Sequence, residues 1–227
     1  MTFSWNGFRR GLQQTIPLAF SVGAYGLLFG MLAQKAGMSL AETLLMCLTV
    51  FAGASQLVAT DLWQSPLPVL AIIVTTFVIN ARHLLMGAAL HPWFKSLKPH
   101  QAYGSLFFCA DENWAFSLAS FQKGEKDLAF LAGGGFSIYT FWFTASWIGF
   151  TGGQIIPDPR VWGLDFAFTA VFLALLVSLW QGRGDLWPWL VAAVAAVVTH
   201  HFLPGKGYIL VGAFLGSLVG AWRYGNR

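Results

Sequence analysis

The chain has 227 residues, of which 56% are hydrophobic and only 10% are charged, with a net charge of +4 and a mean hydropathy of +0.62. Soluble domains usually carry about 25% charged residues, so this chain has too few charges to cover a water-facing surface. The composition therefore excludes an ordinary soluble enzyme, a nucleic-acid-binding domain and a disordered chain, and it predicts an integral membrane protein. The small basic excess is typical of Lys and Arg at the ends of membrane spans.

Apolar runs separated by short polar segments predict the membrane-spanning helices, since a span needs roughly 20 mostly apolar residues. The runs cover residues 11–34, 43–60, 62–81, 102–122, 128–157, 166–182, 186–205 and 207–222. They predict an all-α, multi-pass bundle of about 7–8 spans, forming one domain over residues 1–227. If one run is a re-entrant hairpin, the number of spans is seven.

The N-terminal segment and the two halves of the chain carry weaker signals. Arg9 and Arg10 precede the first run without a clear cleavage site, so we expect that run to remain as a span rather than a signal peptide. Asn80 follows Pro68 by twelve residues, and His200 follows Pro188 by the same interval. Transporters are often built from two repeated halves, so either residues 11–121 and 128–222 are related or the similarity is accidental.

Arg82 is the most costly residue for a membrane segment. It lies at the end of the third run beside Asn80 and His83, and an Arg at the bilayer centre costs about 2.5–3.5 kcal/mol. One interpretation places Arg82 at a helix end among lipid headgroups. The other is a helix break near Asn80, where these side chains line a cavity.

Asp111 and Glu112 interrupt the fourth run, with apolar residues on both sides. Two adjacent carboxyl groups are not expected on a lipid-facing surface, so they either pair with a cation or lie in a solvated turn. Arg82 is the nearest candidate cation. We therefore predict an ion pair between Arg82 and Asp111 or Glu112.

Other polar residues support fewer conclusions. Ser55 and Gln56 follow small residues in the second run, and either they line a pathway or this segment simply packs closely against another helix. Asp165 is either an acid that caps a helix or a third buried carboxyl group. Cys47 and Cys109 are expected to be reduced and buried. No nucleotide-binding, metal-binding or nucleophile motif is present, so we expect no catalytic residue, metal or cofactor.

The order of these motifs resembles that of AzlC-type branched-chain amino acid export permeases. The resemblance covers roughly residues 11–179 and rests on five segments. They are Phe29-Gly30-Met31-Leu32-Ala33, Phe51-Ala52-Gly53-Ala54-Ser55-Gln56, Asn80-Ala81-Arg82-His83, Asp111-Glu112 and Gly163-Leu164-Asp165-Phe166-Ala167.

The resemblance implies the larger subunit of a two-component exporter in the bacterial inner (plasma) membrane, with a small AzlD-type membrane protein as partner. The implied substrates are valine, leucine, isoleucine and methionine. Because polar and charged side chains are costly inside a membrane, we expect those in the apolar runs to bind the substrate. We expect the titratable residues to couple transport to protons. The substrate-binding candidates are Ser55, Gln56, Asn80, Arg82, Asp111 and Glu112, and the proton-coupling candidates are His83, Asp111, Glu112 and Asp165. The alternatives are a passive channel for a small polar solute or a membrane-embedded enzyme.

Overall fold

The structure is a computed structural model that describes residues 2–153, 173, 177, 180, 182–202 and 207–225. The described residues form helices joined by short connections, with one isolated β-bridge between Thr2 and Asp127, which confirms the all-α prediction for this part of the chain. The chain divides into two compact units. The first comprises Met1–Pro68 and Ile79–Asp165, and the second comprises Val69–Val78 and Phe166–Arg227.

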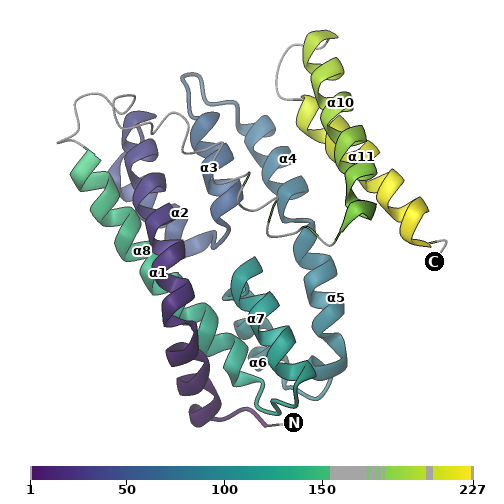
Figure 1. Ribbon diagram of the computed structural model, residues 1–227. Helices are drawn as coiled ribbons and strands as arrows, with labels where there is room; N and C mark the ends of the chain where they lie inside the picture. The colour runs from purple at the N-terminus through teal and green to yellow at the C-terminus, as the bar shows by residue number, and fades with distance from the viewer. Residues whose placement is uncertain are drawn as a thin grey trace. The chain divides into compact units, whose positions relative to one another are not determined.

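Two long helices form the centre of the first unit. They are α1 (Trp5–Lys35) and α8 (Ala129–Gly152), which lie side by side (Figure 1). Their backbones touch at glycines: a Cβ added to Gly11 would lie 2.0 Å from the carbonyl oxygen of Phe130, and one added to Gly30 would lie 2.0 Å from that of Ser146. Because a later residue of α1 meets a later residue of α8, the two helices run parallel.

The second apolar run forms a helical hairpin. It contains α2 (Leu40–Thr49) and α3 (Gly53–Asp61), interrupted at residues 50–52. At the far end of α3, the Thr60 hydroxyl lies 3.9 Å from the Met38 sulfur, just before α2. The two ends of this segment are therefore adjacent, and the prediction of one continuous span over 43–60 is wrong.

The fourth apolar run forms a second hairpin. It contains α6 (Pro99–Phe107) and α7 (Asp111–Gln122), interrupted at residues 108–110. The indole nitrogen of Trp114 donates to the carbonyl oxygen of Met86 at 3.2 Å, and the rings of Trp93 and Phe121 lie 5.9 Å apart. Thus α7 runs parallel to α5 (Arg82–Phe94) and ends beside the point where α6 begins. The prediction of one helix over 102–122 is also wrong.

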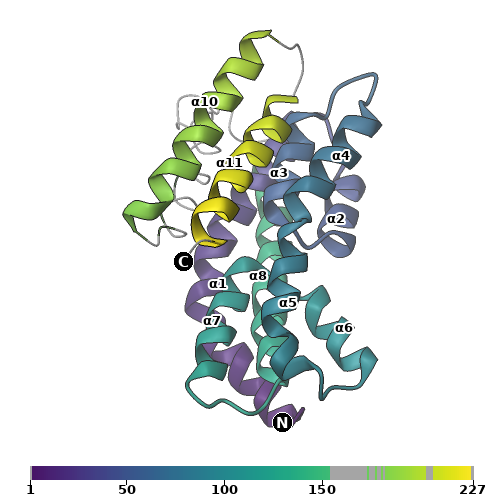
Figure 2. The ribbon, with the colours of Figure 1, turned by 90° about the vertical axis from the view of Figure 1, so that its right-hand side faces the viewer.

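The two hairpins enter the first unit from opposite ends. The α2–α3 hairpin joins the C-terminal end of α1, whereas the α6–α7 hairpin joins the N-terminal end of α8. Because α1 and α8 are parallel, these ends lie on opposite sides, as Figures 1 and 2 show. Each of the four hairpin helices, called half-helices below, is roughly 14–18 Å long at 1.5 Å per residue. Two such hairpins therefore meet near the middle of a hydrocarbon layer about 30 Å thick.

The third apolar run continues beyond its predicted end. After α4 (Val69–Asn80), one residue separates the helix from α5, and α5 passes through Pro92 to Phe94. The helix is interrupted near Asn80 only by Ala81, whose backbone stays in the helical region, so the chain does not unwind there. The prediction of a 62–81 span followed by a loop at residues 91–95 is wrong for His91–Phe94, which are helical.

The second unit contains a helical pair. After the short helix η3 (Arg183–Asp185), α10 (Leu186–Phe202) and α11 (Gly207–Gly225) pack against each other through small residues. A Cβ added to Gly216 would lie 2.8 Å from that of Ala192. Most of the 166–182 run lies outside the described residues, so the count of 7–8 spans and the relation between residues 11–121 and 128–222 stay predictions.

The outer surfaces of the helices are apolar. Large side chains such as Phe77, Leu85 and Val197 are at least 70% exposed. By length and composition, two described segments, Trp5–Lys35 and Val69–Phe94, could cross a membrane, each with a mean hydropathy of 1.8. Apolar side chains exposed over whole helix faces favour contact with lipid.

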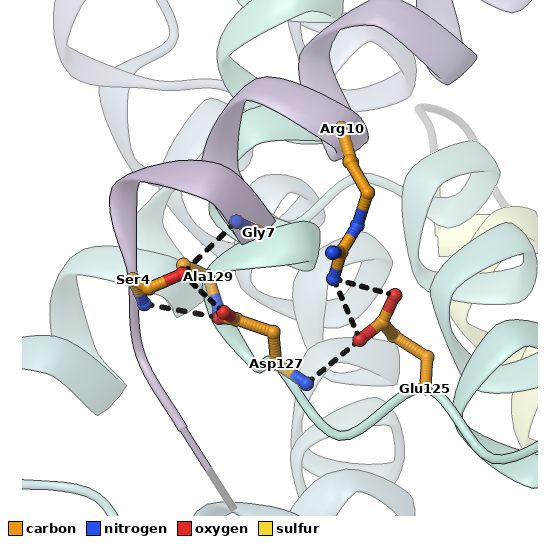
Figure 3. A network of polar contacts seen from close by, with 6 residues as sticks. All are labelled: Ser4, Gly7, Arg10, Glu125, Asp127 and Ala129. Atoms are coloured by element: carbon orange, nitrogen blue, oxygen red, sulfur yellow. Dashed lines mark hydrogen bonds and ion pairs between the residues drawn. The ribbon is translucent and has the colours of Figure 1, made fainter.

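Hydrogen bonds and an ion pair hold the start of α1 against the turn between α7 and α8 (Figure 3). The Asp127 carboxylate accepts hydrogen bonds from the backbone and hydroxyl of Ser4 and from the backbone of Ala129, while Arg10 forms a 3.0 Å ion pair with Glu125. Burial by itself raises the pKa of Asp127, but the hydrogen bonds outweigh it and hold that pKa below its ordinary value. Because Ser4 also caps the helix by accepting from the Gly7 N–H, α1 begins at Trp5 rather than near residue 11.

Candidate functional site

An ion pair joins the start of α5 to the start of α7. A terminal guanidinium nitrogen of Arg82 lies 2.7 Å from a carboxylate oxygen of Asp111. The two side chains are 34% and 30% exposed, so neither is sealed within the protein. The predicted contact between Arg82 and Asp111 is confirmed, and it places opposite charges side by side at two helix starts.

A second set of polar contacts, next to Arg82 in the sequence, reaches the first hairpin. The side-chain amide of Asn80 donates to the hydroxyl of Ser55 at 3.1 Å, and the Nδ1 atom of His83 lies 3.1 Å from the carbonyl oxygen of Asn80. Ser55 belongs to the first turn of α3, and Asn80 is two residues before Arg82. Four of the six predicted substrate-binding residues, from three separate segments, thus form two contacting pairs: Ser55 with Asn80, and Arg82 with Asp111.

Two helices begin at this site after non-helical residues, namely α3 and α7. The residues before them are Ala52 and Ala110, and neither has a side chain that caps the helix. The first turns of a helix present free N–H groups and the positive end of the helix dipole. Asp111 and Glu112 occupy the first turn of α7, where that positive end stabilises their negative charge. The site therefore combines partial positive charge with fixed carboxylates.

Two buried carboxamides support the helix breaks. Gln56, only 1% exposed, donates to the carbonyl oxygens of Met46 and Val50 at 3.0 and 2.7 Å, and it accepts from the indole of Trp142 at 2.8 Å. Both of its donors and its acceptor are occupied, which favours a structural role over the predicted contact with substrate.

Asn113 plays the corresponding part in the second hairpin and is 0% exposed. It donates to the carbonyl oxygens of Phe108 and Leu131 at 3.0 and 3.1 Å, and it accepts from the N–H of Ala110 at 2.6 Å. In the sequence, Asn113 stands out only as the neighbour of Asp111 and Glu112 and carries no predicted role. Its position two residues after Asp111, three residues into a helix, is the signal that could have identified it.

Aromatic rings connect the two breaks to the middle of α8. The ring of Tyr139 lies 5.2 Å from that of Phe51 and 5.3 Å from that of Phe108. Phe51 lies in the first break and Phe108 in the second. Both hairpin tips therefore converge on one side chain of α8.

The remaining candidates differ in how the structure places them. The buried Nε atom of Arg82 has no hydrogen-bond partner among the described residues, which leaves a donor for a ligand. Glu112 is partly exposed beside Asp111, and Asp165 lies outside the described residues. His200 is exposed in α10 of the second unit.

Cys47 and Cys109 are free and buried, as predicted, and the described residues contain no group of three potential metal ligands.

Comparison with known proteins supports the expected family. A family profile described as AzlC protein matches residues 17–156. An uncharacterized membrane protein of Archaeoglobus fulgidus is 30% identical, over 95% of this chain and 94% of its own length. The branched-chain amino acid transport protein AzlC of Bacillus subtilis is 23% identical, over 91% of this chain and 81% of its own.

A third relative, the inner membrane protein YgaZ of Escherichia coli, is 26% identical over 79% of this chain and 76% of its own length. No solved structure matches the chain. The predicted membrane location is confirmed. Since the profile covers more than half of the chain and a relative matches almost all of it at 30% identity, this protein belongs to the AzlC family of membrane proteins.

Proposed function

We propose that this protein is the larger subunit of a secondary transporter that exports branched-chain amino acids from the cytoplasm. Valine, leucine and isoleucine are the main expected substrates, with methionine as a further one. The name of the Bacillus subtilis relative supports the substrate class. The observation that carries the proposal is the Arg82–Asp111 pair, which lies at the junction of two interrupted helices.

A free amino acid carries one carboxylate and one ammonium group. Arg82 offers a guanidinium whose Nε atom has no partner among the described residues, and the uncapped start of α3 offers N–H groups. Both kinds of donor bind carboxylates in proteins. Asp111 and Glu112 supply negative charge for the ammonium group. Partial replacement of the Arg82–Asp111 contact by the substrate would match both charges of the ligand.

The apolar part of the substrate needs a matching surface. The first break contributes the ring of Phe51, and the second contributes that of Phe108. A branched aliphatic side chain of four or fewer carbons gains about 0.8 kcal/mol per buried CH₂ group. Leucine and valine would therefore be retained better than alanine or glycine at such a site.

Coupling to protons is the simplest source of energy, because the sequence has no nucleotide-binding motif. Glu112, Asp111 and His83 are the candidate proton carriers, and Asp165 is a fourth. His83 contacts the Asn80 carbonyl and is next to Arg82 in the sequence, which makes it a candidate for carrying the proton at this site. Export should then fall when an uncoupler removes the proton gradient at constant membrane potential, and an unchanged rate would exclude this coupling.

A small AzlD-type membrane protein is the proposed partner. The resemblance described above supports it, and the exposed apolar helix faces offer a surface for such a subunit within the bilayer. Co-purification of a small hydrophobic protein encoded beside this one would support the assignment. Full export activity of this chain alone would exclude it.

Leucine efflux from cells loaded with a leucine-containing dipeptide tests the proposed function. We expect Arg82→Ala to slow efflux by roughly 10–100-fold, because a charged hydrogen bond contributes about 1.5–3 kcal/mol. Arg10→Ala is the matched control, since Arg10 also forms an ion pair but near the N-terminal end of α1. Equal efflux by both variants, at equal amounts in the membrane, would contradict the proposal. Flux that rises linearly without saturation would indicate a channel instead.

A further inference from the structure

The two hairpins share a sequence pattern. Phe51-Ala52-Gly53-Ala54-Ser55-Gln56 and Phe108-Cys109-Ala110-Asp111-Glu112-Asn113 are 57 positions apart. In each, a Phe is followed by two small residues, two further positions and a carboxamide. In each, the chain leaves a short helix just before or at the Phe and starts another within three residues.

The folded segments share the same geometry. In each hairpin the second half-helix lies beside the long helix that precedes the hairpin: α3 contacts α1, and α7 contacts α5. In each, the Phe ring packs on Tyr139 at 5.2 or 5.3 Å. The hairpins enter from opposite sides (Figure 1). This arrangement is that of a small inverted pair, distinct from the division into residues 11–121 and 128–222.

The carboxamides occupy equivalent places in this pair. Each is at most 1% exposed, each binds a carbonyl oxygen in its own break, and each bonds to α8. On α8, Gln56 uses the Trp142 indole and Asn113 uses the Leu131 carbonyl. These anchor points are about 16 Å apart along the helix, with Tyr139 between them.

We propose that Gln56 and Asn113 are paired positioning residues, each of which fastens one hairpin tip to α8 on either side of the Arg82–Asp111 site. The α1–α8 pair is the fixed support, because glycines bring its two backbones into contact. When one carboxamide loses its bonds, its hairpin leaves α8 and the site opens only toward the side from which that hairpin enters. The role of these residues in transport rests on the proposed function, whereas the attachment of the hairpin tips to α8 does not depend on it.

Two native cysteines report on the two tips. Cys47 lies in α2 and is 0% exposed, while Cys109 lies in the second break and is 2% exposed. Cys109→Ser leaves Cys47 as a reporter of the first hairpin, and Cys47→Ser leaves Cys109 as a reporter of the second. Their modification by a membrane-impermeant charged maleimide, added to one face of sealed vesicles at a time, measures opening and its direction.

The test uses Gln56→Glu and Asn113→Asp, which keep side-chain size but remove the amide donors. Gln56→Glu breaks the bonds to Met46 and Val50 that orient the side chain toward Trp142, whereas Asn113→Asp breaks the bonds to Phe108 and to Leu131 of α8. We expect Gln56→Glu to speed Cys47 modification roughly 30-fold, the effect of two lost hydrogen bonds, from the face where the C-terminal end of α1 lies. Asn113→Asp should do the same for Cys109 from the opposite face. In both variants the leucine KM should rise while the amount of folded protein stays constant.

Trp142→Phe is a milder second variant, because it removes only the donor to Gln56 and keeps an aromatic ring. We expect it to speed modification of Cys47 and not of Cys109. Faster modification of both cysteines from both faces in every variant, or of neither, would overturn the proposal. Modification as expected, in a protein that does not carry leucine, would support the hairpin proposal and refute the substrate instead.

Discussion

The close contact between α1 and α8 makes Gly149 a sensitive position. A Cβ added there would lie 2.0 Å from the carbonyl oxygen of Leu27, whereas ordinary contacts begin at 3.4 Å. Gly149→Ala would therefore push the two helices apart by about 1.4 Å or distort one of them. Overpacking of this kind costs about 1–3 kcal/mol, and a contact between two backbones belongs at the upper end of that range.

Alanine also favours the helix itself, by about 1 kcal/mol over glycine. The expected net loss for Gly149→Ala is therefore about 2 kcal/mol, or a midpoint roughly 4–8 °C lower for a chain of this size. The assay is the fraction of purified protein that remains monodisperse in detergent after heating.

Gly87→Ala in α5 is the matched control for this prediction. A Cβ at Gly87 would meet nothing within 4 Å, so only the favourable helix effect remains and the midpoint should stay equal or rise. If the two variants melted at the same temperature, α1 and α8 would not be in backbone contact, and the fixed support assumed for both hairpins would be absent.

Three further predictions concern ionic and aromatic contacts. Arg82→Asp and Asp111→Arg should each abolish leucine efflux and should partly restore it when combined, and failure of the double variant to exceed either single one would argue against the ion pair. Because the pKa of Asp127 is lowered, its contribution to stability is complete above the ordinary value of 3.8 and is lost as the pH falls through the lower pKa of the folded protein. Ser4→Ala should reduce this acid sensitivity in melting curves measured from pH 7 to 3. Unchanged curves would contradict the hydrogen bonds between Ser4 and Asp127. Tyr139→Phe loses only the 3.2 Å hydrogen bond to a backbone carbonyl, so its free energy of unfolding should stay within about 1 kcal/mol of that of the native protein. Tyr139→Ala removes the ring contacts to both hairpins and should expose both buried thiols. Equal melting of the two variants would refute the packing of both hairpin tips on Tyr139.

Hydropathy was sufficient to predict helices and membrane insertion, because both depend on local composition. It could not reveal that residues 43–60 and 102–122 turn back at their centres. Both breaks consist of apolar or small residues, and what holds them is a side chain bonding to carbonyl oxygens. Such a bond depends on three-dimensional contacts that apolar run lengths do not contain.

The Arg82–Asp111 contact could be predicted because the cost of an unpaired charge in lipid leaves few arrangements. Gln56 was read as a candidate ligand because a polar residue in an apolar run suggests a pathway. Its donors instead bind the chain itself. The role of Asn113 depends on where α7 begins, which hydropathy does not define, although a carboxamide at the third position of a helix is typical of a cap. The Pro92 region was read as a loop, yet α5 continues through it.

The central claim is that the Arg82–Asp111 junction binds a zwitterionic amino acid. Leucine binding by the purified protein, followed as the rise in melting temperature with leucine concentration, tests this claim without any assumption about coupling or direction. Leucine should stabilise the native protein and Arg10→Ala alike, by about 2.7 kcal/mol at a concentration 100 times the native Kd, and should stabilise Arg82→Ala by only about 0.4–1.4 kcal/mol at that concentration, since its Kd is expected to be roughly 10–100-fold higher. If Arg82→Ala were stabilised as strongly as the native protein, leucine would bind elsewhere and the assignment of this site would be wrong.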